Sequence, residues 1–128
     1  MEGERYKILI VEDNQQTQLI IKVALRNEYD LQSATNVSTA ISLLSNNNFD
    51  LILLDLNLQG KEDGKIILIE IREKMKNFDL PVIIISAYDL KPEDEEFFNE
   101  NADGFISKPF DKETLLHLIS SQKVIKEW

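Results

Sequence analysis

The sequence lacks cysteine entirely and has only one histidine among its 128 residues. Without cysteine, the chain can form no disulfide bond, no thiolate metal site and no cysteine nucleophile. No apolar run is longer than five residues, whereas a membrane-spanning helix needs about 20. Residues 1–7 carry charges and no apolar stretch, so they do not form a secretory signal. We therefore expect a cytoplasmic protein that makes no membrane contact.

Basic residues are also scarce. The chain has 14 Lys and Arg residues against 23 Asp and Glu residues, which gives a net charge of −9. A nucleic acid would be repelled by such a surface unless a basic patch were segregated on it, and the sequence contains no such patch. We expect no direct binding of nucleic acid.

The acidic residues are concentrated between positions 89 and 103. This segment contains one lysine and seven carboxylates: Asp89, Glu93, Asp94, Glu95, Glu96, Glu100 and Asp103. Two interpretations remain open. The segment is either a solvated helix face or a docking surface for a basic partner.

Two patterns alternate along the chain. Five short β-rich runs lie at residues 7–11, 31–35, 51–55, 82–86 and 104–107. The segments between them have apolar residues at helical spacing. These apolar stripes are Ile20, Ile21, Ala24 and Leu25; Ile41, Leu43 and Leu44; Ile66, Ile67, Ile71 and Met75; and Leu115, Leu116, Ile119 and Val124. A weaker helix is expected from Pro92 to Glu100.

This alternation predicts βα units joined by right-handed crossovers, and hence a parallel sheet covered on both faces. The central runs are aliphatic without alternation, as in Leu51–Leu54, which is typical of strands buried on both sides. The length is that of one domain. We expect a single α/β domain over residues 1–128.

Polar residues follow four of the five predicted strands. They are Glu12 and Asp13 after the first, Asp55 at the end of the third, Ser86 at the end of the fourth and Lys108 after the fifth. Each has an ordinary alternative: the acidic pair as a helix cap, Ser86 as a turn residue and Lys108 as a surface charge. However, the carboxyl ends of parallel strands share one edge of a sheet, where ligands bind. Their coincidence at this edge favours a functional site.

Three carboxylates brought together repel one another unless a cation lies between them. With no cysteine and no nearby histidine, the available ligands are oxygens, which favours Mg²⁺ or Mn²⁺ over zinc. Such a metal together with Lys108 and Ser86 would suit a phosphoryl group. A carboxylate can also act as a nucleophile.

The segments "ILIVEDN", "DLILLDLNL", "PVIIISAYD" and "GFISKPF" match a known pattern in order and in strand context. The chain resembles the receiver domain of two-component response regulators over nearly its whole length. Glu12 and Asp13 match the acidic pair and Asp55 matches the phosphorylated aspartate. Ser86 matches the Ser/Thr switch residue, and Lys108 matches the lysine of the Lys-Pro motif.

The resemblance implies a flavodoxin-like (βα)₅ fold with strand order 2-1-3-4-5. It also implies that Asp13 and Asp55 bind Mg²⁺ directly, that the backbone carbonyl of Asn57 is a third ligand and that Glu12 acts through water. The peptide bond before Pro109 is expected to be cis.

By the same resemblance, a histidine kinase or histidine phosphotransfer protein donates a phosphoryl group to Asp55. The domain catalyses only its own phosphorylation and dephosphorylation and is otherwise not an enzyme. Ser86 would then move inward and Phe105 would turn into the vacated space. Asn57 and Tyr88 would tune the phosphoryl lifetime.

The output surface implied by the resemblance comprises the fourth helix, the fifth strand and the fifth helix. A downstream protein effector is expected there, and the domain is expected to be a monomer or a phosphorylation-dependent homodimer. No output domain follows Trp128, which suggests either a stand-alone receiver or one excised from a larger protein such as a hybrid kinase.

The loop after Asp55 departs from the family pattern, with Gln59 where proline is usual and one extra residue before Gly64. Two alternatives remain: a receiver-like module that binds partners without phosphorylation, and a Mg²⁺-dependent phosphatase with an aspartyl nucleophile. The phosphatase is disfavoured because Asn57 stands where such enzymes have a second acid. His117 is expected to be an ordinary residue of the last helix.

Overall fold

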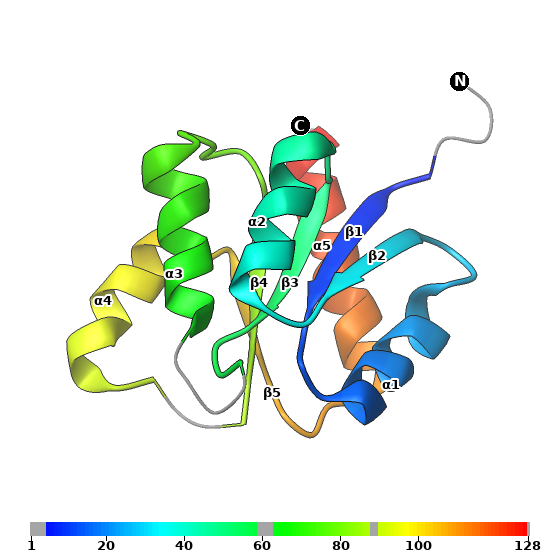
Figure 1. The fold of residues 1–128 in the computed structure, drawn as a ribbon. Helices are drawn as coiled ribbons and strands as arrows, with labels where there is room; N and C mark the ends of the chain where they lie inside the picture. The colour runs from blue at the N-terminus through cyan, green and yellow to red at the C-terminus, as the bar shows by residue number, and fades with distance from the viewer. Residues whose placement is uncertain (1–4, 59–62, 88–89, 128) are drawn as a thin grey trace.

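The computed structural model describes residues 5–58, 63–87 and 90–127 (Figure 1). Strands and helices alternate throughout this part of the chain. Their order is β1 (Lys7–Val11), α1 (Gln15–Leu25), β2 (Asp30–Ala34), α2 (Val37–Asn46), β3 (Leu51–Asp55), α3 (Asp63–Ile69), the π-helix η1 (Glu70–Lys74), β4 (Val82–Ser86), α4 (Pro92–Asn101), β5 (Gly104–Ser107) and α5 (Lys112–Glu127). None of the helices in these ranges is both long and apolar enough to cross a membrane.

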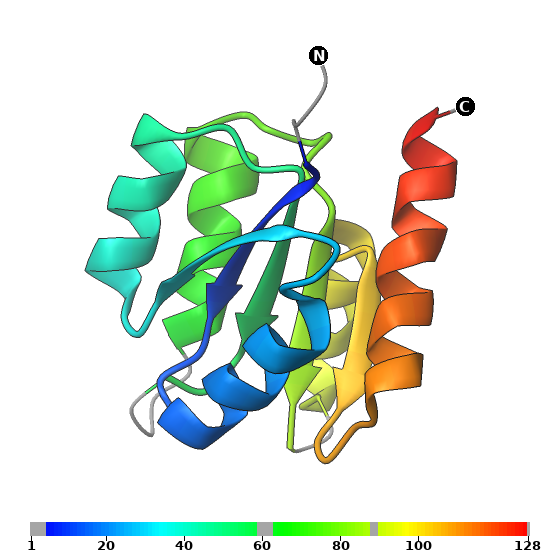
Figure 2. The same cartoon turned by 90° about the vertical axis from the view of Figure 1, so that its right-hand side faces the viewer.

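The five strands form one parallel sheet in the order β2-β1-β3-β4-β5. The predicted flavodoxin-like topology is therefore confirmed. All the strands point the same way, so their carboxyl ends meet at the lower edge in Figure 2. The register aligns Val11 with Leu54 and Ser86 with Ser107. Glu12 thus follows β1 at the level of Asp55, and Lys108 follows β5 one step beyond Ser86.

Helices cover both faces of the sheet, with α1 and α5 on one face and α2, α3 and α4 on the other (Figures 1 and 2). Successive residues of a buried strand point to opposite faces. The strand residues beneath α2, α3 and α4 are Leu9, Val11, Ala34, Ile52, Leu54, Val82 and Ile84. Those beneath α1 and α5 are Ile8, Ile10, Leu51, Leu53, Ile83, Ile85 and Ile106. The aliphatic runs therefore fill two cores and hold the strand ends in place.

Three elements differ from the sequence prediction, and the smallest difference is that α4 ends at Asn101, one residue later than predicted. Strand β2 begins and ends one residue earlier than the predicted 31–35. The third helical segment changes to a π-helix over Glu70–Lys74, where the N–H of Met75 donates to the carbonyl of Glu70, five residues earlier, at 2.9 Å. Within this wider turn, Arg72 points inward and is 4% exposed. An interior arginine falls outside the apolar periodicity on which the prediction rested.

The predicted apolar stripe of α1 is only partly buried. Ile21 and Leu25 are fully enclosed, but the side chain of Ile20 is 58% exposed. Leu19 and Val23 are also exposed, at 61% and 47%. We call these three exposed residues, Leu19, Ile20 and Val23, the α1 apolar face. Helical periodicity identified apolar residues of α1 but not the width of the surface that the sheet covers.

Candidate functional site

Three carboxylates meet at the carboxyl edge of the sheet. Glu12, Asp13 and Asp55 each offer an oxygen, and these oxygens all lie within 4.8 Å of one another. Glu12 is completely buried, Asp55 is 3% exposed and Asp13 is half-buried. The structure thus brings together the acidic residues that the sequence analysis singled out.

The acidic pair does not cap α1, so that alternative for Glu12 and Asp13 is wrong. The N-cap is Asn14, whose Oδ1 accepts a 2.9 Å hydrogen bond from the N–H of Thr17. The N–H of Asn14 in turn donates to Glu12 Oε2 at 3.1 Å. Because Asn14 takes the capping role, the carboxylates of the pair can serve the site instead.

Lys108 lies against two of the three carboxylates. Its Nζ is 2.7 Å from Glu12 Oε1 and donates to Asp55 Oδ2 at 3.1 Å. The backbone N–H of Lys108 donates to the carbonyl of Ser86 at 2.9 Å, which fixes the end of β5 to the end of β4. The Lys108–Pro109 peptide bond is cis, as predicted.

The charges at this edge are incompletely balanced by Lys108. Burial, followed by the neighbouring Asp55 carboxylate, raises the pKa of Glu12 from 4.5 to about 7, although Lys108 and the Asn14 N–H act in the opposite direction. Burial alone would lower the pKa of Lys108, but Glu12 and Asp55 outweigh it and raise that pKa. A further cation at this edge would offset the remaining negative charge of the carboxylates and so stabilise the site. Carboxylate oxygens are the ligands that Mg²⁺ and Mn²⁺ prefer, so the residues present fit such an ion.

The loop after β3 is held against the Asp55 carboxylate. The N–H of Asn57 donates to Asp55 Oδ1 at 3.1 Å, so Asn57 lies beside the acidic cluster where the sequence analysis expected it. Gln59 lies outside the described residues.

Gly64 supports this loop in a way that the sequence analysis missed. A Cβ atom at Gly64 would lie 2.4 Å from the Asp55 carbonyl oxygen and 2.7 Å from the Cα of Leu56, so no side chain fits there. The N–H of Gly64 also donates to the Leu56 carbonyl at 3.1 Å. The Asp-Gly pair at positions 63 and 64 was the available signal, but its contact with Asp55 depends on the tertiary structure.

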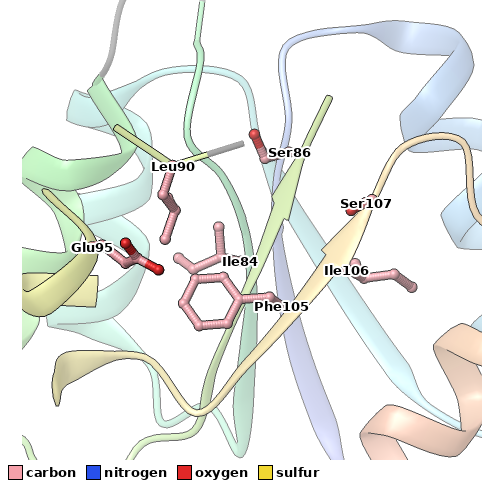
Figure 3. A pocket seen from close by; sticks show the side chains of 7 residues that line it. All are labelled: Ile84, Ser86, Leu90, Glu95, Phe105, Ile106 and Ser107. Atoms are coloured by element: carbon pink, nitrogen blue, oxygen red, sulfur yellow. The ribbon is translucent and has the colours of Figure 1, made fainter. Parts of the chain in front are cut away.

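A cleft of about 320 Å³ lies between β4, β5 and α4 (Figure 3). It is lined by Ile84, Ser86, Leu90, Glu95, Phe105, Ile106 and Ser107. In Figure 3, Leu90 and Glu95 lie on the side of α4, and the ring of Phe105 reaches toward them from β5. Phe105 is 42% exposed, so it is not an ordinary core residue. Tyr88 lies outside the described residues.

Two of the described carboxylates of the acidic segment form ion pairs, and Asp89 lies outside the described residues. Asp94 Oδ1 lies 2.5 Å from Lys65 Nζ, and Asp103 Oδ2 lies 3.1 Å from Arg72. The exposed carboxylates of α4 are Glu93, Glu95, Glu96 and Glu100. His117 is exposed on α5.

Comparison with known proteins places these residues in a family. The sequence pattern of the response regulator receiver domain matches residues 8–120. The nisin biosynthesis regulatory protein NisR of Lactococcus lactis subsp. lactis is 34% identical over 115 residues, which cover 87% of this chain and 47% of that protein. The heme response regulator HssR of Staphylococcus haemolyticus is 32% identical over 132 residues, which cover 94% of this chain and 56% of that protein. The chain thus spans about half the length of these two relatives.

Solved structures show the same fold. A CheY-like receiver domain protein of Methanospirillum hungatei JF-1 has a TM-score of 0.86 at 25% identity, with 97% of this chain and 98% of that chain covered. A receiver domain of a LuxO-type repressor from Vibrio parahaemolyticus has a TM-score of 0.85 at 22% identity, with 97% and 94% covered. The chain belongs to the family of response regulator receiver domains, whose standard role is that of a phosphorylation-dependent switch in two-component signalling.

Proposed function

We propose that residues 1–128 form a single receiver domain in which Asp55 accepts a phosphoryl group from a phosphorylated histidine. An Asp55 carboxylate oxygen attacks the phosphorus, an O–P bond forms as the P–N bond breaks, and the imidazole leaves. Water later attacks the phosphorus, which releases phosphate and restores the carboxylate. Asp55's own phosphorylation and dephosphorylation are the only chemistry in this proposal.

The contact of Lys108 with both Glu12 and Asp55, at 2.7 and 3.1 Å, is the observation that carries the proposal. A buried carboxylate beside a fixed ammonium is placed to react with an anionic group whose charge the ammonium can neutralise. Lys108 would bind one phosphoryl oxygen, and the Ser86 hydroxyl would donate to another. The backbone bond from Lys108 to Ser86 sets the distance between these two groups.

Mg²⁺ or Mn²⁺ would be held by Asp13, Asp55 and the Asn57 carbonyl, with Glu12 acting through water. When bound, the metal neutralises charge on the phosphoryl oxygens. Asn57 and Tyr88 would lie beside the phosphoryl group and influence how long it survives.

The phosphodonor partner would be a histidine kinase or a histidine phosphotransfer protein in the cytoplasm. A groove of about 380 Å³ beside the site supports a protein partner of this kind. It is lined by Leu19, Ile20, Val23, Ala24, Phe110, Lys112 and Leu115. The groove therefore combines the α1 apolar face with Phe110, two residues after Lys108, and the start of α5. Exposed apolar patches of this kind mark protein interaction surfaces.

The switch would connect Asp55 to the α4-β5-α5 surface. A phosphoryl group gives the Ser86 hydroxyl a new acceptor, and the ring of Phe105 has the cleft of Figure 3 to turn into. Because phenylalanine has no hydroxyl, only packing contacts would stabilise the Phe105 ring once it has turned into the cleft. This surface would bind a downstream protein effector, or a second copy of the domain after phosphorylation.

We expect the effector to be basic, because Glu93, Glu96 and Glu100 are exposed on α4. For a protein found to bind α4-β5-α5, reversing these three charges to lysine should weaken binding, and added salt should weaken it too. A binding constant insensitive to both changes would contradict a basic partner.

The switch can be tested by NMR with phosphoramidate, which carries the same P–N bond as phosphohistidine. With phosphoramidate and Mg²⁺ present, amide signals of Ser86, Phe105 and α4 should shift, and they should return as the phosphoryl group hydrolyses. Asp55→Asn should show no such shifts. A phosphorylated domain whose α4 and β5 signals stay unchanged would refute the switch and leave only a phosphate acceptor.

A further inference from the structure

Gln18 is a buried polar residue that the proposed chemistry does not use. It lies on α1 with 9% of its surface exposed. Its Nε2 donates to the carbonyl of Glu12 at 2.6 Å and lies 3.5 Å from the carbonyl of Ala34. A helix side chain thus reaches the backbone at the ends of both β1 and β2.

These contacts hold the peptide groups on both sides of Glu12. The N–H of Glu12 donates to the Ala34 carbonyl at 3.0 Å, and the carbonyl of Glu12 accepts from Gln18. That carbonyl belongs to the peptide that joins Glu12 to Asp13. Its orientation sets the directions in which both side chains leave the backbone. The amide of Gln18 is therefore placed to orient two carboxylates of the acidic cluster.

The chain contains a natural counterpart to Gln18 at the opposite edge of the sheet. Gln122 on α5 is 8% exposed, and its Nε2 donates to the carbonyl of Asp103, the residue before β5, at 3.3 Å. Both glutamines are buried and tie a helix to the backbone beside a strand. Only Gln18 does so next to the acidic pair, so the two can be compared directly.

We propose that Gln18 is a positioning residue of the metal site, which orients Glu12 and Asp13 through the peptide between them. This inference rests on the proposed function, since it assumes that the acidic cluster binds Mg²⁺. Groups that orient metal ligands from behind typically contribute 10- to 100-fold to metal affinity. Loss of the Gln18 amide should therefore weaken Mg²⁺ binding by about 10-fold.

The test compares Gln18→Met with Gln122→Met, since methionine has a similar length and cannot donate these hydrogen bonds. Mg²⁺ affinity is measured by NMR titration of the Asp13 and Asn57 amides, and thermal unfolding is followed by circular dichroism without metal. Both variants should unfold at lower temperature than the wild type. Only Gln18→Met should bind Mg²⁺ more weakly. Gln18→Leu provides a second variant if the methionine variant does not fold.

Three outcomes would overturn the inference. If Gln18→Met binds Mg²⁺ with wild-type affinity, Gln18 contributes to stability alone. If Gln122→Met weakens Mg²⁺ binding as much as Gln18→Met does, the effect comes from a general loss of stability. A wild-type domain that binds no Mg²⁺ would contradict the proposed function and the inference together. The wild-type titration therefore separates failure of the proposed function from failure of the inference.

Discussion

The ammonium of Lys108 lies 3.1 Å from Oδ2 of Asp55, although 53 positions separate the two residues in the sequence. Asp55 is the last residue of β3 and Lys108 follows β5, with β4 between these two strands. The two side chains therefore meet past the carboxyl edge of the sheet, and not through strand pairing. The same ammonium contacts Glu12 at 2.7 Å. Lys108 thus joins the ends of β1, β3 and β5.

Lys108→Met should strongly slow phosphorylation of Asp55. The substitution leaves Glu12 and Asp55 without their ammonium partner and removes a cation that would bind the phosphoryl group. Loss of one well-placed donor of this kind typically costs about 100-fold in rate. Rates of labelling with phosphoramidate would measure the effect. Lys74→Met, which changes a lysine of η1 whose side chain is 72% exposed, is the control and should keep the wild-type rate.

Glu12 should make the stability of the metal-free domain depend on pH. Its pKa is raised from 4.5 to about 7 on folding, so the folded state favours the protonated form. The stabilisation is fully present below about pH 4.5 and is lost as the pH rises through about 7. Glu12→Gln should remove this decrease in the free energy of unfolding with rising pH. Urea unfolding in EDTA across that range would measure it, with the exposed Glu28→Gln as control. Parallel pH profiles for wild type and Glu12→Gln would refute the assignment.

Gly64→Ala should destabilise the domain and disturb the site. The new Cβ would lie 2.4 Å from the Asp55 carbonyl oxygen, so the start of α3 must move away from β3. Overpacking of this kind costs about 1–3 kcal/mol. Gly104→Ala is a matched control, because its Cβ would meet the Leu118 side chain at 3.3 Å, and that side chain can adjust. Denaturant unfolding should rank Gly104→Ala as the milder change, and the reverse order would contradict this packing argument.

Arg72→Met should be among the most destabilising substitutions away from the site. The guanidinium donates to the carbonyls of Asn77, Leu80 and Asn101, each at 2.9 Å, and to Asp103 at 3.1 Å. Removing it takes this donor from the three carbonyls and from Asp103, although Asp103 keeps the N–H of Val82 at 2.8 Å, and the cost is about 3 kcal/mol. Denaturant midpoints would report the loss. Arg26→Met, on an exposed arginine, should cost less than about 0.5 kcal/mol.

The strand order was implied by the resemblance to receiver domains, whereas the parallel sheet and the main site residues could be predicted from the sequence pattern itself. Once the β-rich runs are assigned to a parallel sheet, topology alone sends Glu12, Asp55 and Lys108 to one edge. Their spacing along the chain then becomes unimportant. The same logic placed Ser86 at the end of β4, where the structure has it.

The remaining features depend on contacts that no periodic pattern encodes. Gln18 and Arg72 are polar side chains whose partners are backbone carbonyls of distant segments, so burial could not be read from their residue types. Gly64 is required by the approach of α3 to β3. Ile20 was assigned to an apolar stripe, yet it is exposed because the sheet covers only part of α1.

The identity of the phosphorylated residue tests the account most directly. The domain would be incubated with acetyl phosphate and Mg²⁺, and the modified residue would be located by mass spectrometry of its peptides. We predict one Mg²⁺-dependent phosphoryl group on Asp55, none in Asp55→Asn and none in the presence of EDTA. A wild-type domain that stays unmodified, or that carries the group on Asp13 or Glu12 instead, would contradict the account.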